Sequence, residues 1–126
     1  MSAAENKAAT EAAYQAFAAG DLEGAMKNLA DDVEWIVPGN STVSGTYRGK
    51  AEVAGFFATL AGKSFRTEPQ HFVAEGDHVV VLTHTTSEGD VSADQADVLT
   101  FRDGKVVKFQ SATDTALLEA VWGKKE

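Results

Sequence analysis

Two aspartates in the last third of the chain are the residues best suited to chemistry. Asp97 interrupts an otherwise apolar strand pattern, and Asp114 stands where a pair of strands gives way to a helix. A carboxylate that faces a core must be paired, neutralised or functional, because burial of a lone charge is costly. If Asp97 is buried more deeply than Asp114, their pKa values separate, as acid–base chemistry in one pocket requires.

Two other side chains could join them. His84 shares strand parity with Val80 and Leu82, so we expect it at the core edge or in a pocket, as the one candidate imidazole base. Tyr14, on the first helix, could offer its hydroxyl. Each candidate also has a structural interpretation. Asp97 could be a solvated or paired acid, and Asp114 could be a helix cap. His84 and Tyr14 could be core side chains whose polar atoms are hydrogen-bonded.

The elements that would position these residues follow from the hydrophobic period. One domain of 126 residues is expected. Two segments with helical spacing come first, followed by one strand and a third helix. After Gly62 the hydrophobic period changes to two, as in strands, until a last short helix. The predicted helices are residues 3–19, 22–29, 50–61 and 115–122, and the predicted strands are 32–39, 64–74, 78–87, 94–102 and 105–112. This order predicts an α+β fold with helices on one face of a mostly antiparallel sheet.

The turn at residues 102–104 decides which face each side chain of the last hairpin takes. A three-residue loop with Gly104 in the left-handed conformation would pair Phe101 with Lys105 and Asp97 with Phe109. The predicted apolar face is then Asp97, Leu99, Val107, Phe109 and Ser111. The opposite face would carry Val98, Thr100, Val106, Lys108 and Gln110. A two-residue turn would instead bring Lys108 beside Asp97, so the longer loop is favoured.

Large side chains elsewhere predict the walls of a pocket. Their number favours an apolar ligand over a sugar or a phosphate. The wall and ligand-binding residues we expect are Trp35, Val37, Phe56, Phe57, Phe72, Leu99 and Phe109.

Composition argues against several classes of protein. The net charge is −8 and there are no cysteines, so we expect no nucleic acid or membrane partner and no thiolate site. The three histidines lack the i, i+4 spacing of zinc enzymes, and the glycines form no phosphate loop. We therefore expect neither a metal nor a cofactor. The N-terminus lacks a signal-peptide pattern and no apolar run spans a bilayer, which predicts a soluble, cytoplasmic protein.

Several short motifs resemble one known superfamily. They are residues 18–23 (AAGDLE), 29–35 (LADDVEW), 38–39 (PG), 45–49 (GTYRG), 101–105 (FRDGK) and 114–115 (DT). Together they resemble the SnoaL-like, ketosteroid-isomerase-related branch of the nuclear-transport-factor-2-like superfamily, over nearly the whole chain. The resemblance implies a cone-shaped α+β barrel with a mostly apolar pocket at its open end. It also implies a homodimer through the outer sheet face, where Val98, Thr100, Val106 and Ala112 are expected.

The resemblance also implies roles for the candidates. Asp97 resembles the oxyanion-hole aspartic acid of ketosteroid isomerase, an example known in detail, and Tyr14 resembles its partner tyrosine. Asp114 resembles the acid/base aspartate of SnoaL-like cyclases, whereas Val37 stands where the isomerases carry their base. The leading hypothesis is cofactor-free isomerisation, cyclisation or dehydration of an apolar carbonyl compound, with Asp114 or His84 as base.

Two alternatives stay open. One is a ligand-binding or dimerisation domain without catalysis. The other is an epoxide hydrolase, which would need Arg48, Arg66 or Arg102 to bridge two carboxylates inside the cone.

Overall fold

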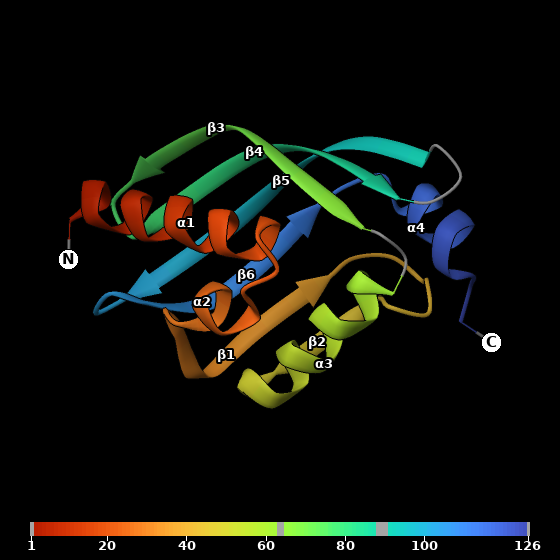
Figure 1. Cartoon of the computed structure of the whole chain (residues 1–126), viewed down its shortest axis with the longest axis horizontal. Coiled ribbons are helices and arrows are strands. Elements are labelled where there is room, and N and C mark those ends of the chain that lie inside the picture. The colour runs from red at the N-terminus through yellow and green to blue at the C-terminus, as the bar shows by residue number, and fades with distance from the viewer. Residues whose placement is uncertain (1, 63–64, 88–90, 126) are drawn as a thin grey trace.

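Six strands form one sheet in the order β2-β1-β6-β5-β4-β3 (Figure 1). The structure is a computed structural model and describes residues 2–62, 65–87 and 91–125. Neighbouring strands are antiparallel except for β1 and β6, which are parallel. The strands are β1 (Leu29–Val37), β2 (Gly45–Arg48), β3 (Arg66–Glu75), β4 (His78–Ser87), β5 (Val91–Arg102) and β6 (Lys105–Ala112).

Helices cover one face of this sheet. They are α1 (Ala3–Ala18), α2 (Leu22–Met26), α3 (Gly49–Ala61) and α4 (Thr115–Trp122). Figure 1 shows α1 lying across β3 and β4, α3 beside β1 and β2, and α4 at one end of the sheet. The predicted α+β fold with helices on one face is confirmed.

Local sequence chemistry fixes where the helices begin. Ser2 and Glu5 form a reciprocal capping box at the start of α1. The Asp21 carboxylate accepts a hydrogen bond from the Gly24 amide at the start of α2. These caps satisfy backbone amides that have no partner within the helix.

Most predicted elements occur close to their predicted bounds. The strands His78–Ser87 and Lys105–Ala112 and the helix Thr115–Trp122 match the prediction. The short strand β2 was not predicted, because its segment is polar and rich in glycine. Ser64, the predicted start of one strand, lies outside the described residues, and so do Gly89 and Asp90, a residue pair that predicts a turn between two of the strands.

The register of the last hairpin differs from the prediction. Arg102 pairs with Lys105 around a two-residue turn, in which Asp103 and Gly104 both have positive φ. A bulge then leaves Val107 as the extra residue, so that Leu99 pairs with Phe109. Val106 is therefore buried in the core at 3% exposure and is not part of the outer face. Lys108 stays exposed despite the short turn, because the bulge shifts the register.

The core lies between the sheet and the helices. Val33, Val53, Val79 and Val81 have no exposed surface, and the α3 residues Phe56 and Phe57 pack onto the same cluster. Among the described residues, no helix combines the length and apolar character that a bilayer crossing requires.

Candidate functional site

Asp97 lies in the middle of β5 on the face that the helices cover. It pairs with Val81 of β4 and Ser111 of β6, and only 2% of its surface is exposed. Strand alternation places Leu99 and Phe101 on the same side. A carboxyl group is thus held inside an apolar core.

Three hydrogen-bond donors surround this carboxyl group. The Tyr14 hydroxyl, from α1, donates to Oδ2 of Asp97. The Gln95 side-chain amide donates to Oδ1 at 2.8 Å, and the Ser111 hydroxyl also hydrogen-bonds the group. Donors on both oxygens stabilise the ionised form.

Burial affects the pKa of Asp97 more strongly than these donors do. Desolvation raises the pKa of Asp97 to about 6, while the hydrogen bonds from Tyr14, Gln95 and Ser111 lower it in part. Burial, together with the neighbouring Asp97 charge, raises the pKa of Tyr14 well above its ordinary value. The tyrosine therefore stays protonated, and the carboxyl group changes charge near neutral pH, as an efficient proton acceptor does.

Asp97 and Tyr14 face a cavity of about 110 Å³. The cavity lies between the sheet and the helices and extends to α4. Its polar lining residues other than Asp97 and Tyr14 are Thr10, Asn28, Thr67, Gln95, Ser111 and Thr113. Its apolar lining residues are Ala9, Ala13, Phe17, Ala25, Leu29, Trp35, Val37, Val43, Phe56, Phe57, Leu60, Phe65, Leu99, Phe101, Val106, Phe109, Leu118 and Trp122.

The aromatic wall is built on one stacked pair. Trp35 of β1 lies on Phe109 of β6, with ring centroids 3.6 Å apart and planes 8° apart. Phe57 meets the same indole edge to face at 5.1 Å, and Phe56 also lines the cavity. Flat apolar surfaces of this kind suit a ligand with a ring.

Of the predicted wall residues, Phe72 alone does not line the cavity. Trp35, Val37, Phe56, Phe57, Leu99 and Phe109 all do. Phe72 instead forms a T-shaped pair with the Tyr14 ring, with centroids 5.7 Å apart. It supports the tyrosine from outside the cavity.

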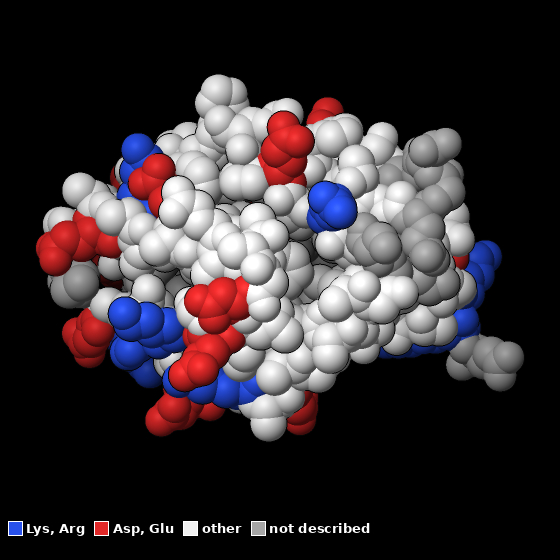
Figure 2. All heavy atoms as spheres, in the orientation of Figure 1, with Lys and Arg blue, Asp and Glu red and all other residues white. Residues whose placement is uncertain are grey.

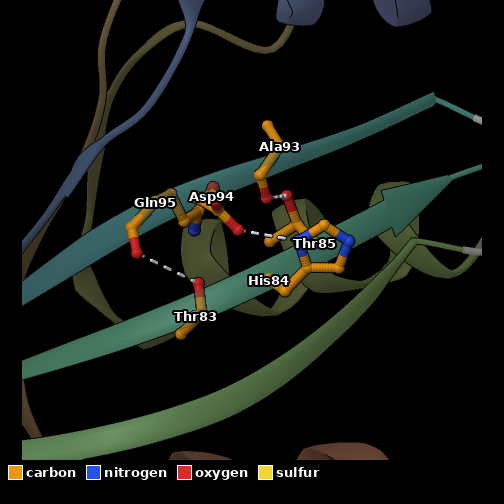
Figure 3. A network of polar contacts seen from close by, with 6 residues as sticks. All are labelled: Thr83, His84, Thr85, Ala93, Asp94 and Gln95. Atoms are coloured by element: carbon orange, nitrogen blue, oxygen red, sulfur yellow. Dashed lines mark hydrogen bonds and ion pairs between the residues drawn. The ribbon is translucent and has the colours of Figure 1, made fainter.

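His84 lies away from the cavity, which corrects its expected pocket position. It shares the uncovered face of the sheet with Leu82, and its Nδ1 lies 2.8 Å from Oδ1 of Asp94. Figure 3 shows His84 and Asp94 pointing toward each other across β4 and β5, while the Thr83 and Thr85 hydroxyls bond to carbonyl oxygens of β5. His84 cannot reach a ligand beside Asp97.

Asp114 also lies outside the main cavity. It is exposed, and its carboxylate accepts a hydrogen bond of 3.0 Å from the Ala116 amide, as the N-cap of α4. It borders a second, smaller hollow of about 20 Å³, which shares Gln95 and Thr113 with the main cavity. Asp97 and Asp114 therefore do not converge on one point.

The arginines that an epoxide hydrolase would need lie at the surface. The Arg48 guanidinium is 2.7 Å from Glu34, with 68% of its side chain exposed. Arg102 lies 3.9 Å from Asp32, and Arg66 is exposed. None of the three lines the cavity.

Gln95 and Ser111 are polar residues at the site whose role the sequence did not reveal. Gln95 precedes Asp97 by two positions, so strand alternation places both on one face. Ser111 was expected on that face, but only the bulged register sets it directly opposite Asp97. Within the described part of the chain, no group of three or more acidic or histidine side chains is arranged to hold a metal ion.

Figure 2 shows the helix-covered side of the molecule. Charged side chains gather over α2 and the nearby strand ends, and the surface over most of α3 is uncharged. The third helix thus presents little charge on the side of the molecule that encloses the cavity.

Comparisons with known proteins agree with this architecture. A family model described as a SnoaL-like domain matches residues 10–109. An NTF2-like protein of unknown function from Burkholderia pseudomallei is 28% identical, with a TM-score of 0.83 over 97% of this chain and 98% of that chain. TerC, co-crystallised with polyporic acid, is also 28% identical, with a TM-score of 0.83 over 93% of this chain and 97% of its own.

A third structure shows the fold alone. Bal32a, from a soil-derived mobile gene cassette, is 22% identical, with a TM-score of 0.89 over 95% of this chain and 98% of that chain. No curated protein sequence matches the chain.

Proposed function

The chain belongs to the SnoaL-like domain family, and we propose that it binds a small, mostly apolar carbonyl compound and moves a proton on it without a cofactor. The observation that carries this proposal is the Asp97 carboxyl group, buried in the wall of an aromatic cavity. The crystal structure of the relative TerC with polyporic acid supports an organic compound as the ligand.

Asp97 is the proton acceptor in this proposal. With the carbonyl compound in the cavity, an Asp97 oxygen takes a proton from the carbon next to the carbonyl. The C–H bond breaks, an O–H bond forms on Asp97, and the electron pair moves to the carbonyl oxygen as an enolate. Return of the proton to the same or another carbon completes exchange or isomerisation.

Tyr14 and Gln95 are assigned to positioning and charge stabilisation. Their hydrogen bonds hold the carboxyl group at the cavity wall. Once Asp97 is protonated it no longer needs the Tyr14 hydrogen bond as strongly, so the hydroxyl can donate to the enolate oxygen. This assignment differs from the donor role that the family resemblance implied for Asp97, because three donors already point at its oxygens.

Deuterium exchange tests the proposal. A panel of one-ring and two-ring ketones is incubated with the protein in D₂O at pH 7.5, and loss of the α-proton signals is followed by NMR. We expect catalysed exchange that falls on the order of 100-fold or more in Asp97→Asn. The control is Asp94→Asn, an equal charge change on the uncovered face of the same strand, which keeps the wild-type rate. Equal rates in wild type and Asp97→Asn would refute the role of Asp97.

A ligand-binding domain without catalysis is the second candidate. Val37 favours it, because this residue lines the cavity at the place where the resembling isomerases carry their base. Such a domain would bind the same ketones through the aromatic wall but exchange none of their protons. Binding without exchange in the experiment above selects this candidate.

We also propose that two copies associate through the uncovered face of the sheet. The large exposed hydrophobic residues Val73 and Leu82 lie there, and burial of such residues favours association. Leu82→Lys combined with Val98→Lys would place charges on this face, so we expect the wild type to sediment as a dimer and the double variant as a monomer. A monomeric wild type at high concentration would contradict this.

A further inference from the structure

The charge balance of the cavity is one-sided. Asp97 is the one acidic residue among the described residues that line it, and none of the lining residues is a lysine, arginine or histidine. The remaining polar side-chain groups are hydroxyls, side-chain amides and the indole N–H groups of Trp35 and Trp122, all of them uncharged. No positive charge in the lining therefore offsets the Asp97 carboxylate.

The fold also keeps solvent from screening this carboxylate. Asp97 is 2% exposed, and beyond its uncharged hydrogen-bond donors Tyr14, Gln95 and Ser111 the cavity lining is mostly rings and aliphatic side chains. In such a medium, two negative charges a few ångströms apart repel each other far more strongly than they do in water. An anionic ligand could enter only if it or Asp97 took up a proton.

An uncharged ligand meets no such penalty. An ionised carboxylate has about four lone-pair positions, and Tyr14, Gln95 and Ser111 use three of them. One position is left for a hydroxyl or a polarised C–H group of a ligand. The rings of Trp35 and Phe109 then provide apolar contact for the rest of it.

We propose that this cavity selects its ligand by charge: it admits uncharged ring compounds that bear a hydroxyl or a carbonyl group, and it excludes carboxylates of the same size. This inference rests on the binding half of the proposed function, and it narrows the substrate class to neutral molecules. It does not depend on catalysis.

Two tryptophans provide the readout. The chain contains only two, Trp35 and Trp122, and both line the cavity. Benzyl alcohol, acetophenone and benzoate are matched one-ring probes. They are small members of this class, chosen because the cavity of about 110 Å³ is smaller than an apolar cavity of roughly 150 Å³ that holds benzene in another protein. Each is titrated at pH 8 while tryptophan emission is recorded with excitation at 295 nm.

We expect both neutral probes to bind, and benzoate to bind at least roughly tenfold more weakly. In Asp97→Asn the ratio of benzyl alcohol affinity to benzoate affinity should fall to about threefold or less. Asp94→Asn should keep the wild-type ratio. The neutral probes also show whether the Asp97→Asn cavity remains intact. Benzoate binding equal to that of benzyl alcohol in wild type, or no binding by any probe, would overturn the proposal.

A second measurement needs no variant. Between pH 8 and pH 5 benzoate stays mostly ionised, because ordinary carboxyl groups have pKa values of about 4, whereas Asp97 takes up a proton. Tyr14, the other titratable group in the lining, stays neutral throughout. Benzoate affinity should therefore rise toward pH 5 relative to benzyl alcohol affinity, and a ratio of the two affinities that stays flat with pH would refute selection by Asp97.

The outcomes separate this inference from the proposed catalysis. Charge discrimination without deuterium exchange would leave the inference standing and identify a binding protein. Deuterium exchange without discrimination between neutral and anionic probes would support the catalytic proposal and refute selection of the ligand by charge.

Discussion

The Tyr14 hydroxyl donates a hydrogen bond to Oδ2 of Asp97 and so joins α1 to β5 across 83 positions of the sequence. The bond lies at the wall of the cavity, where Gln95 holds the other carboxyl oxygen. One contact thus packs a helix on the sheet and also orients the acid that faces the ligand.

Removal of the Tyr14 hydroxyl should raise the pKa of Asp97. The hydrogen bond lowers that pKa from what burial alone would give, so Tyr14→Phe should shift it upward from about 6. An NMR titration of the Asp97 carboxyl carbon measures the shift. Tyr47→Phe is the control, because the Tyr47 hydroxyl donates to the Val43 carbonyl oxygen at 2.6 Å, away from Asp97. An unchanged pKa in Tyr14→Phe would mean that the bond contributes little in solution.

Asp97 should also make the protein less stable as pH rises. Its pKa is about 6 in the folded protein against 3.8 as the reference value, so the folded state binds its proton more tightly. Between about pH 4 and pH 6 the folded state holds more protons, and the free energy of unfolding therefore falls as pH rises through this window. The loss is on the order of 3 kcal/mol and is complete above pH 6 to 7.

Urea denaturation at several pH values tests this assignment. Other carboxyl groups add their own pH dependence, so the informative quantity is the difference between the wild type and Asp97→Asn. We expect the variant to lose most of the decline between pH 4.5 and pH 7, and Asp94→Asn to retain it. Parallel curves for the wild type and Asp97→Asn would contradict a raised pKa at Asp97.

Strand alternation predicted the inward position of Asp97, and it failed for His84 for an identifiable reason. Val79, Val80 and Val81 are all apolar, so the sequence shows no alternation from which to choose the buried face. The helices decide it, because they cover the side of Val79 and Val81. His84, which shares parity with Val80, is left on the uncovered face.

The resemblance to the SnoaL-like branch predicted the fold correctly, and the family match confirms it. The detailed arrangement of the site was harder to predict from the sequence, because it depends on one bulge. A bulge adds a residue that the two-residue period cannot anticipate, and it exchanged the expected positions of Val106 and Val107. The contact between Tyr14 and Asp97 depends on how α1 lies on the sheet, which local patterns do not encode.

The bulge leads to a matched pair of stability measurements. Val106 is 3% exposed and Val107 is half-buried, although both belong to one strand and one residue type. Val106→Ala should cost roughly 2 kcal/mol of unfolding free energy, because it removes buried methyl groups from the core. Val107→Ala should cost under about 1 kcal/mol. The reverse order in urea denaturation would favour the unbulged register.

Asp114 should matter for the last helix and not for proton transfer. Its carboxylate caps α4 by accepting a hydrogen bond from the Ala116 amide, so Asp114→Ala should lower stability by about 1 kcal/mol. Asp114→Asn keeps the capping oxygen and should be nearly neutral, since asparagine caps about as well as aspartate. Neither change should slow the deuterium exchange assigned to Asp97. If Asp114→Asn removed exchange while stability stayed unchanged, Asp114 would be the proton acceptor, reaching the ligand across the polar residues that the two hollows share.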